Sequence, residues 1–554
     1  MYCIQIRKLD INDRSEDRNI GGFIVSDYMK EIKKRRTFAI ISHPDAGKTT
    51  LTEKFLLYGG AINTAGSVKG KQSSKHAVSD WMEIEKQRGI SVTSSVLQFN
   101  YDGYCINILD TPGHQDFSED TYRTLMAADY AVMVIDASKG VEAQTKKLFK
   151  VCLLRDIPIF TFINKMDREA NHPFDLLDEI ETELGIRTCP VNWPIGSGKE
   201  FKGVYDRNTK HITTFQSSQK GGQKEALINE VSINDPNIDS IIGPDYHRNL
   251  HDEIELLDGA SNIFDMEEVS HGKLSPVFFG SALTNFGVEN FLKHFLEMTS
   301  SPLPRKSDAG IIDPFDKDFS AFVFKIQANM NKAHRDRIAF MRICSGKFEA
   351  GMEVTHVQGN KKMKLLQPQQ LMAQERKIVE EAYAGDIIGV FDPGIFAIGD
   401  TICTSNQKFE FEGIPTFAPE HFARIRQVDT MKRKQFTKGV MQIAQEGAIQ
   451  IFQEFNTGME EIIVGVVGVL QFDVLKFRLD SEYGVEIRME SLPYEHIRWI
   501  KDKMLDLNSI KGITDMKKVK DLKGNPLLLF ANPWSIRTLL ERNEGLELLE
   551  FNRD

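Results

Sequence analysis

The sequence predicts three successive domains: an α/β domain built on a parallel sheet, a β-barrel and an α+β domain. A length of 554 residues exceeds what a single core usually serves, because domains commonly hold about 100 to 200 residues. In the first half, apolar strand-like runs alternate with helical stretches, as in a parallel sheet with crossover helices. Short strands punctuated by glycines follow, and the last part mixes helices with strands.

The composition is that of a folded, water-soluble protein. Hydrophobic residues make up 41% and charged residues 27% of the chain, which excludes a disordered or a membrane composition. The formal charge of -10 argues against a purely electrostatic grip on nucleic acid, so an RNA partner would need local basic patches. Candidates are Lys30–Arg36, Lys432–Lys434 and Lys517 with its neighbours Lys518 and Lys520, although taken singly each is more often an ordinary solvated face.

Cysteine usage and hydropathy predict a cytoplasmic protein without membrane segments. The six cysteines form no CxxC pair, which argues against a disulfide framework and against a zinc site. No apolar run approaches the roughly 18 residues that a membrane span needs. Residues 1–28 lack the apolar stretch of a signal peptide, so we expect either a loose N-terminal extension or a true start at Met29.

The first domain is expected at residues 29–302. Its first strand is Thr37–Ser42, and its first helix is Lys48–Leu57. The further elements expected here are strands Cys105–Leu109, Tyr130–Ile135 and Ile157–Ile163, helix Gln144–Leu154, and a last strand and helix within Val277–Leu296. The stretch of about 196–274 is irregular and polar, so we interpret it as an insertion.

The Pro-containing segment Ser300–Ser307 has the composition of a linker and predicts a domain boundary near residue 303. A β-barrel is expected at 303–410, with strands Phe319–Ile326, Arg337–Cys344, Met352–Val357, Asp386–Phe391 and Asp400–Thr404. The α+β domain is expected at 411–554, with helices Met431–Gln445 and Val469–Leu479 around strand Glu461–Val467.

The most informative motif, SHPDAGKT, lies between the first strand and the first helix. It fits a phosphate-binding P-loop, except that a serine replaces the usual first glycine. Backbone N–H groups and the helix N-terminus attract phosphate, the lysine supplies a point charge, and the threonine hydroxyl can ligate Mg²⁺. The predicted phosphate-binding residues are Ser42, His43, Pro44, Asp45, Ala46, Gly47, Lys48 and Thr49.

A second phosphate motif, DTPGH, follows the strand that ends at Leu109. A carboxylate at this place can reach a magnesium ion through water, and a glycine N–H can sense the γ-phosphate. The phosphate-binding residues predicted from this motif are Asp110, Thr111, Pro112 and Gly113.

Two further motifs, NKMD and GSAL, each follow a predicted strand and indicate the base. The Asp167 carboxylate can accept hydrogen bonds from guanine N1–H and N2–H₂, whereas adenine has an acceptor at N1 and no amine at C2. Four motifs in this order, each at the C-terminal end of a strand, indicate GTP as the nucleotide. The predicted guanine-binding residues are Asn164, Lys165, Met166, Asp167, Ser281 and Ala282.

The order of the motifs resembles that of the translational GTPases, which implies an α/β P-loop GTPase domain followed by a β-barrel domain and an α+β domain. The resemblance places Arg88–Ser91 as the first switch, with Ser91 where the family commonly has a magnesium-ligating threonine. The implied Mg²⁺ ligands are therefore Thr49, Ser91 and, through water, Asp110. His114 occupies the position that orients the attacking water, so it is the expected catalytic residue.

Segments outside the nucleotide motifs resemble the GTPase (class II) release factors, notably SDWMEIEKQRGIS, VNWPIGSGKEFKGVYD, FVFKIQANM and VGVLQFDVL. The resemblance covers the chain from Met29 to the 530s. It implies a monomeric cytoplasmic GTPase, stimulated by the ribosome, that contacts ribosomal RNA and drives out the codon-reading (class I) release factors after peptide release, whichever the stop codon. GTP hydrolysis to GDP would then let it leave.

Three other interpretations remain at this point. A different translational GTPase, such as a ribosome-protection or translocase-like factor, shares the nucleotide motifs. A GTP-dependent assembly module that hydrolyses negligibly is disfavoured by the presence of His114. An adenylyltransferase on the same scaffold would transfer adenylyl groups from ATP.

Overall fold

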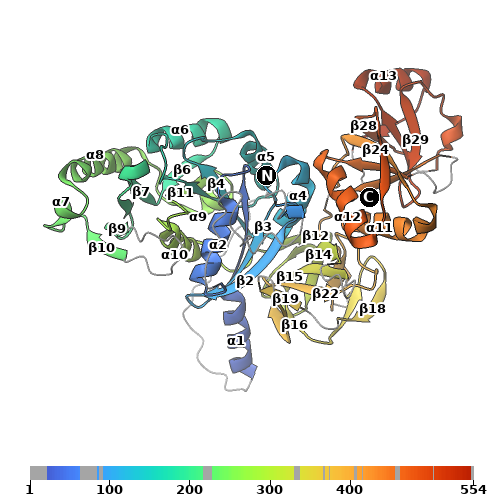
Figure 1. Cartoon of the computed structure of the whole chain (residues 1–554). Coiled ribbons are helices and arrows are strands. Elements are labelled where there is room, and N and C mark those ends of the chain that lie inside the picture. The colour runs from blue at the N-terminus through green and yellow to red at the C-terminus, as the bar shows by residue number, and fades with distance from the viewer. Residues whose placement is uncertain are drawn as a thin grey trace.

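The computed structural model has three parts, drawn in Figure 1 with the N-terminal domain at the left, the barrel below and the C-terminal domain at the upper right. Together they confirm the predicted fold class of a P-loop domain, a β-barrel and an α+β domain. The structure describes residues 21–62, 84–85, 91–215, 228–329, 337–365, 369–372, 375–404, 408–414, 416–455, 462–502 and 504–550.

A seven-stranded sheet in the order β2-β3-β1-β4-β5-β11-β6 forms the centre of the first domain. Its strands are parallel except for the edge strand β2, which runs antiparallel to β3. The strands are β1 Arg35–Ser42, β2 Ser95–Tyr101, β3 Tyr104–Asp110, β4 Tyr130–Asp136, β5 Ile159–Asn164, β6 Arg187–Pro190 and β11 Leu274–Phe279. Such a sheet brings the loops after β1, β3, β5 and β11 to one edge, which is where a nucleotide site is expected.

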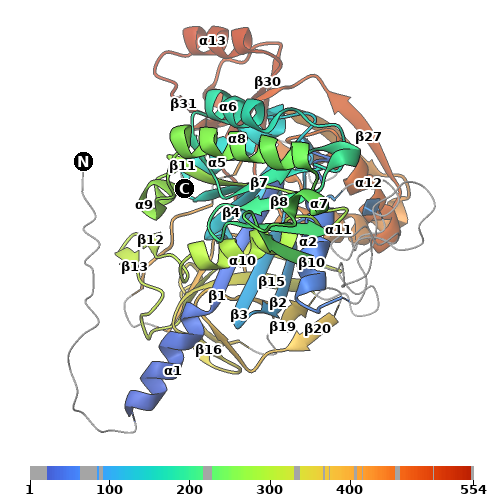
Figure 2. The same cartoon turned by 90° about the vertical axis from the view of Figure 1, so that its left-hand side faces the viewer.

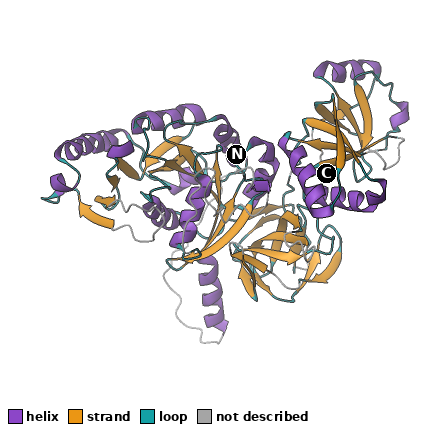
Figure 3. Cartoon of the chain, viewed as in Figure 1, coloured by secondary structure: helices purple, strands orange, loops and turns teal. Residues whose placement is uncertain are grey.

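Helices cover both faces of this sheet, as Figure 3 shows. Phe55 of α2 and Phe291 of α10 pack in one apolar cluster, and Phe149 of α5 and Leu176 of α6 pack in another. The helices of the domain are α1 Gly21–Lys33, α2 Lys48–Tyr58, η1 Gln115–Phe117, α4 Ser118–Ala127, α5 Ala143–Leu154, α6 Pro173–Leu184 and α10 Val288–Met298. Helix α1 thus crosses residue 29, where we expected the domain to begin.

The stretch interpreted as an insertion contributes three strands, β8, β9 and β10, to a four-stranded antiparallel sheet in the order β10-β9-β8-β7, and β7 directly precedes this stretch. Helix α8 packs on this sheet, since Leu250 and Leu257 share a cluster with Trp193 (Figure 2). The elements are β7 Asn192–Ile195, η2 Gly198–Glu200, β8 Gly203–Asp206, β9 His211–Phe215, β10 Ile228–Ser232, α7 Ile238–Ile241, α8 Pro244–Ala260 and α9 Met266–Ser270. Strands of four or five residues are too short to show a clear periodicity in sequence.

The second part is a barrel whose eight strands run in the order β18-β17-β23-β14-β15-β22-β19-β20. A small β16-β21 pair and the β12-β13 hairpin accompany it. The strands are β12 Arg305–Ser307, β13 Gly310–Ile312, β14 Ser320–Ala328, β15 Arg337–Ser345, β16 Lys347–Glu349, β17 Glu353–His356, β18 Lys361–Lys364, β19 Gln369–Met372, β20 Glu375–Ile378, β21 Glu381–Tyr383, β22 Ile387–Phe391 and β23 Thr401–Cys403.

The third part is an antiparallel sheet in the order β27-β24-β26-β25-β29-β30-β28-β31, with helices packed against it. Its elements are β24 His421–Gln427, η3 Thr430–Lys432, α11 Arg433–Gln445, β25 Gln450–Glu454, β26 Ile462–Val466, α12 Leu470–Tyr483, β27 Ile487–Leu492, β28 His496–Ile500, η4 Leu507–Ser509, β29 Met516–Lys520, β30 Pro526–Phe530, α13 Pro533–Arg542 and β31 Leu548–Leu549. No helix among the described residues has the length and apolar character needed to cross a membrane.

Buried charged groups join the first domain to the barrel. The Arg342 guanidinium contacts the Asp129 carboxylate at 2.6 Å, and Arg35 Nε contacts Asp386 Oδ2 at 2.8 Å. Arg35 is 7% exposed and Arg36 is 6% exposed. Arg35 therefore serves the domain junction, while Arg36 Nε donates to Thr299 Oγ1 at 3.0 Å within the first domain, so the basic stretch Lys30–Arg36 is not a continuous surface for RNA.

Of the other two basic candidates, only Lys432–Lys434 is exposed throughout. Lys517 pairs with Glu454 at 2.9 Å, and Lys518 donates to the backbone oxygens of Leu507 and Ile510. The lysines of β29 therefore help to hold their own domain together.

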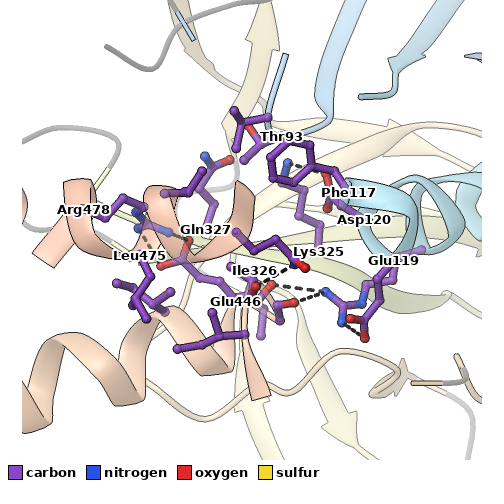
Figure 4. Close-up of a pocket in the computed structure, with 18 residues that line it drawn as sticks. Thr93, Phe117, Glu119, Asp120, Lys325, Ile326, Gln327, Glu446, Leu475 and Arg478 are labelled. Atoms are coloured by element: carbon purple, nitrogen blue, oxygen red, sulfur yellow. Dashed lines mark hydrogen bonds and ion pairs between the residues drawn. The ribbon is translucent and has the colours of Figure 1, made fainter. Parts of the chain in front are cut away.

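All three parts meet around a cavity of about 50 Å³, shown in Figure 4. Phe117, at the end of η1, packs with Val92 and with Val474 of α12. Lys325 of the barrel donates to Ser94 Oγ at 3.0 Å. On the opposite side of the cavity, Arg478 of α12 pairs with Glu446 at 3.0 Å. The loops around the nucleotide motifs thus contact both other domains.

Candidate nucleotide-binding site

The SHPDAGKT loop connects β1 to α2 at the C-terminal edge of the central sheet. Gly47 has φ +100°, a conformation that L-residues rarely adopt, and a Cβ there would lie 2.2 Å from Asn164 Nδ2. Glycine is therefore required on both counts. Asp45 also has a positive φ, of 64°. The loop is consequently curled in the way that lets successive N–H groups face a phosphate.

Asn164, at the end of β5, links this loop to the GSAL loop after β11. Its Nδ2 donates to Ala46 O at 2.8 Å, and its Oδ1 accepts from Ala282 N at 2.8 Å. Both ends of the buried side chain are therefore used by neighbouring loops. Met166 is fully buried, and its N–H donates to Gly280 O. These two residues position the loops from within the protein.

Lys165 lies across the P-loop. Its Nζ donates to Asp45 O at 2.5 Å and pairs with Asp136 Oδ2 at 2.7 Å. Burial acts to raise the pKa of Asp136, but the hydrogen bonds from Lys165 and Ser138 outweigh it, so the pKa lies below its ordinary value. The Lys165 aliphatic stem is thereby held as one wall of the site.

Asp167 and Ser281 meet at the far end of the site. Ser281 Oγ donates to Asp167 Oδ1 at 2.5 Å. One carboxylate oxygen is thus held by the hydroxyl, which orients the carboxylate beside the cavity that Asp167 lines. An oriented acceptor at this place suits two adjacent N–H donors on a base.

A cavity of about 320 Å³ joins the four motifs, which is within the size range of small-molecule sites. Its walls include these predicted residues: Ser42, His43, Pro44, Asp45, Gly47, Lys48, Thr49, Ser91, Gly113, His114, Asn164, Lys165 and Asp167. Ala46, Asp110, Thr111, Pro112, Met166, Ser281 and Ala282 are not among its walls. Several of these contact the wall residues from behind, as the bonds of Ala46 and Ala282 to Asn164 and of Ser281 to Asp167 show.

The cavity also has walls that the sequence reasoning did not include among the site residues, namely Thr50, Arg168 and Leu283. Each directly follows a predicted site residue or motif: Thr50 follows Thr49, Arg168 follows the NKMD motif, and Leu283 closes GSAL. Their adjacency was a usable signal, but motif spacing alone does not indicate which neighbour faces the ligand.

Lys48 and Asp110 form a buried ion pair beneath the cavity. Thr111, next in the chain, donates its hydroxyl to Ile40 O at 2.7 Å and so fixes the DTPGH segment against β1. With the Thr49 and Ser91 side chains at the cavity wall, this region combines two hydroxyls with one carboxylate. Hard oxygen donors of this kind fit Mg²⁺. Arg88–Ile90 of the first switch lie outside the described residues.

His114 lies at the cavity wall, with its side chain about one-third exposed. The Asp116 N–H donates to His114 Nδ1 at 3.3 Å, and Asp116 Oδ1 lies 3.2 Å from the same nitrogen. The Pro112 carbonyl accepts from Thr121 Oγ1. Gly113 passes close to Pro44, because a Cβ on Gly113 would be 3.4 Å from Pro44 Cα. The second phosphate motif thus packs directly on the first.

Family models cover most of the chain. The "Elongation factor Tu GTP binding domain" matches residues 33–301, and "Elongation factor G domain 2" matches 318–405. The model "Class II release factor RF3, C-terminal domain" matches 411–540. A crystal structure of a protein from Thermus thermophilus superposes with a TM-score of 0.65, covering 88% of this chain and 72% of that one, at 20% identity. The fold is therefore shared with a known structure.

Relatives named "Peptide chain release factor 3" resemble the chain over nearly all of its length. The one from Symbiobacterium thermophilum is 59% identical, covering 93% of this chain and 97% of the relative. Those from a Cyanothece strain and from Gloeobacter violaceus are each 55% identical, covering 94% of this chain and 95% and 98% of the relatives. These relatives and the matching family models agree with the P-loop site described above. The chain therefore belongs to the peptide chain release factor 3 family and is a GTPase of translation termination.

Proposed function

We propose that the protein, in its GTP form, binds the terminating ribosome and promotes dissociation of the class I release factors after peptide release. It does so whichever stop codon is present, and GTP hydrolysis then allows its own departure. It acts as a monomer in the cytoplasm, touching ribosomal RNA. Support comes from the family and from the joint contact of both other domains with the loops around the nucleotide site.

The observation that carries this proposal is the convergence of four motifs on one cavity. We assign binding of the guanine base to Asn164, Lys165, Met166, Asp167, Ser281 and Ala282. Of these, Asn164, Lys165 and Asp167 line the cavity. The Asp167 carboxylate, oriented by Ser281, accepts from guanine N1–H and N2–H₂. Asn164 and Met166 contribute by holding the loops at their separation.

The phosphates lie against the P-loop and the DTPGH segment in this proposal. The N–H groups from residue 45 to residue 49 and the Lys48 ammonium bind them, and the N–H of Gly113 reports the γ-phosphate. Thr49, Ser91 and, through water, Asp110 would hold Mg²⁺, which supplies charge neutralisation at the phosphates when it is bound. In the described conformation Lys48 pairs with Asp110, so the phosphates would compete for this lysine.

His114 orients the attacking water in the proposed mechanism. Phosphoryl transfer needs positioning and charge stabilisation more than covalent help from the protein, so a correctly placed imidazole is sufficient. Intrinsic hydrolysis is slow, because activators acting in trans can supply about 10³ to 10⁵ in rate for such enzymes. Ribosome binding is the stimulus here.

The recycling function is tested by multiple-turnover peptide release from stop-codon-programmed ribosomes with a limiting amount of class I factor. We expect acceleration by the protein with GTP at every stop codon, and none with GDP or with the His114→Ala variant. Ribosome-stimulated hydrolysis without any acceleration of release turnover would contradict the proposal.

The guanine assignment has a separate test. Asp167→Asn exchanges one acceptor oxygen for an N–H donor, which suits the C2 carbonyl of xanthine and opposes the C2 amine of guanine. We expect GTP affinity to fall about 100-fold and XTP affinity to rise, measured with fluorescent nucleotide analogues. Asp178→Asn, an exposed carboxylate of α6, serves as the control. Unchanged nucleotide preference in Asp167→Asn would remove Asp167 from the base site.

A further inference from the structure

At the start of helix α12 of the C-terminal domain, the Gln471 and Phe472 N–H groups bond to the carbonyls of Gly468 and Val469. The N-cap residue is Val469, whose apolar side chain offers no hydrogen bond to the N–H of Leu470. A carboxylate from the first domain takes that place: Asp116 Oδ2 accepts from Leu470 N at 2.8 Å. The negative charge also lies at the positive end of the helix dipole, which stabilises the contact further.

The approach of Asp116 to α12 depends on Gly468. A Cβ at residue 468 would lie 2.2 Å from Asp116 Cγ and 2.5 Å from Asp116 Cα, closer than any non-bonded contact allows. The Gly468 backbone is not in the left-handed region, so glycine is needed here for space and not for conformation. Gly468 belongs to the VGVLQFDVL segment, and no residue of this segment is among the walls of the nucleotide cavity.

The same carboxylate also contacts the proposed hydrolytic histidine. Asp116 Oδ1 lies 3.2 Å from His114 Nδ1 and accepts a hydrogen bond from it when this nitrogen carries the proton; in the other tautomer the nitrogen accepts from the Asp116 N–H at 3.3 Å. Asp116 is 6% exposed, so water does not easily replace either contact. Phe117 packs against Val474 one turn further along α12 and holds the η1 turn in place. His114, Asp116 and the start of α12 therefore form one connected unit.

We infer that Asp116 is a positioning residue for His114 and that the N-terminus of α12 sets the direction of its carboxylate. A short side chain held at both oxygens cannot turn unless one contact breaks. When the C-terminal domain stays docked, His114 remains at the wall of the nucleotide cavity. When the domain moves away, the Asp116 carboxylate loses the Leu470 N–H, and His114 is then no longer kept in position by Asp116. Hydrolysis thereby depends on where the C-terminal domain lies, in addition to the γ-phosphate. This inference rests on the role proposed for His114.

The test compares ribosome-stimulated GTP hydrolysis by wild type, Gly468→Ala, Asp116→Ala and the double variant. Gly468→Ala leaves the first domain untouched but forces α12 off Asp116. We expect kcat to fall about 10- to 100-fold, the range for a misplaced catalytic group, with KM and GTP affinity unchanged. Because both changes act through one contact, the double variant should be no slower than Asp116→Ala alone.

Gly512→Ala is the matched control, since it makes the same change in the same domain with nothing within 4 Å of the new Cβ. Thermal unfolding verifies that each variant is folded. His114→Ala separates the two proposals. If His114→Ala hydrolyses normally, the role of His114 fails and this inference fails with it. If His114→Ala is inactive while Gly468→Ala and Asp116→Ala keep the wild-type kcat, or raise KM instead, only this inference is overturned.

Discussion

At the scale of single residues, the site is built by side chains that hold loops as much as by those that face the ligand. The Asn164 side-chain amide forms hydrogen bonds with the backbone of Ala46 and of Ala282, so its role is to keep the P-loop and the GSAL loop at a fixed distance. Gly47 makes room for that amide. The NKMD and SHPDAGKT motifs are thus one unit in space, although more than a hundred residues separate them in the chain.

Gly47→Ala tests this closeness. The new Cβ would overlap Asn164 Nδ2, and alanine would have to adopt φ +100°. Together these effects destabilise the native loop conformation by about 1–3 kcal/mol or more. We expect GTP affinity to fall about 100-fold while the overall fold is kept, measured by equilibrium binding of a fluorescent GTP analogue. Gly103→Ala has a similar positive φ but no neighbour within 4 Å, so it should bind GTP normally. Equal losses in both variants would show that the contact with Asn164 is unimportant.

At the scale of elements, a buried carboxylate is one of the groups that anchor the insertion to the rest of the first domain. His294 of α10 lies 2.6 Å from Asp206 Oδ2 at the end of β8, and Asn290 donates to the same oxygen at 2.8 Å. Burial acts to raise the pKa of Asp206, but the hydrogen bonds to its charged form prevail and lower the pKa to about 2. The charged carboxylate is therefore the form that ties the insertion sheet to α10.

This anchor gives a pH-dependent prediction. Because the folded-state pKa of Asp206 is below the unfolded value of 3.8, its contribution to stability is present above pH 4 and is lost as the pH falls toward 2. We expect Asp206→Asn to lower stability at pH 7 by about 1 kcal/mol, a figure reduced for solvent screening. The difference from wild type should shrink below pH 4, as followed by calorimetric unfolding. A difference that grows on acidification would contradict the assignment.

At the scale of the whole molecule, two junctions of different character connect the domains. The first domain and the barrel share fully buried charges, such as Arg342 with Asp129. The C-terminal domain instead meets the loops around the nucleotide site through apolar contacts and hydrogen bonds to backbone groups, such as Asp116 with the Leu470 N–H, beside a cavity (Figure 4). We interpret the first junction as a rigid connection and the second as the one that responds to nucleotide.

Arg342→Met tests the rigid junction. Removing one partner of a buried pair leaves Asp129 with a poorly compensated charge, and such changes cost about 3–5 kcal/mol. We expect a clearly lower unfolding midpoint but unchanged GTP affinity, because Arg342 is not a wall of the nucleotide cavity. The exposed pair Arg248 with Asp245 provides the control, since Arg248→Met should cost no more than about 1 kcal/mol. Similar effects in both variants would refute the distinction.

The sequence by itself determined the class of the fold, the nucleotide motifs and the family, because these depend on local patterns that survive without knowledge of contacts. Strand-loop-helix periodicity predicted β1 and α2, and the order of four short motifs indicated GTP. The roles assigned to individual site residues stay predictions for the experiments above.

Only the tertiary structure decided which residues meet across long separations. It showed that Arg35 is buried at a junction, that the insertion contributes strands to a sheet, and that Asp116 lies between His114 and α12. A basic run looks the same in sequence whether water or another domain covers it. Likewise, a carboxylate does not reveal its partner when more than three hundred residues lie between them, because packing of separate domains, and not local pattern, brings the two together.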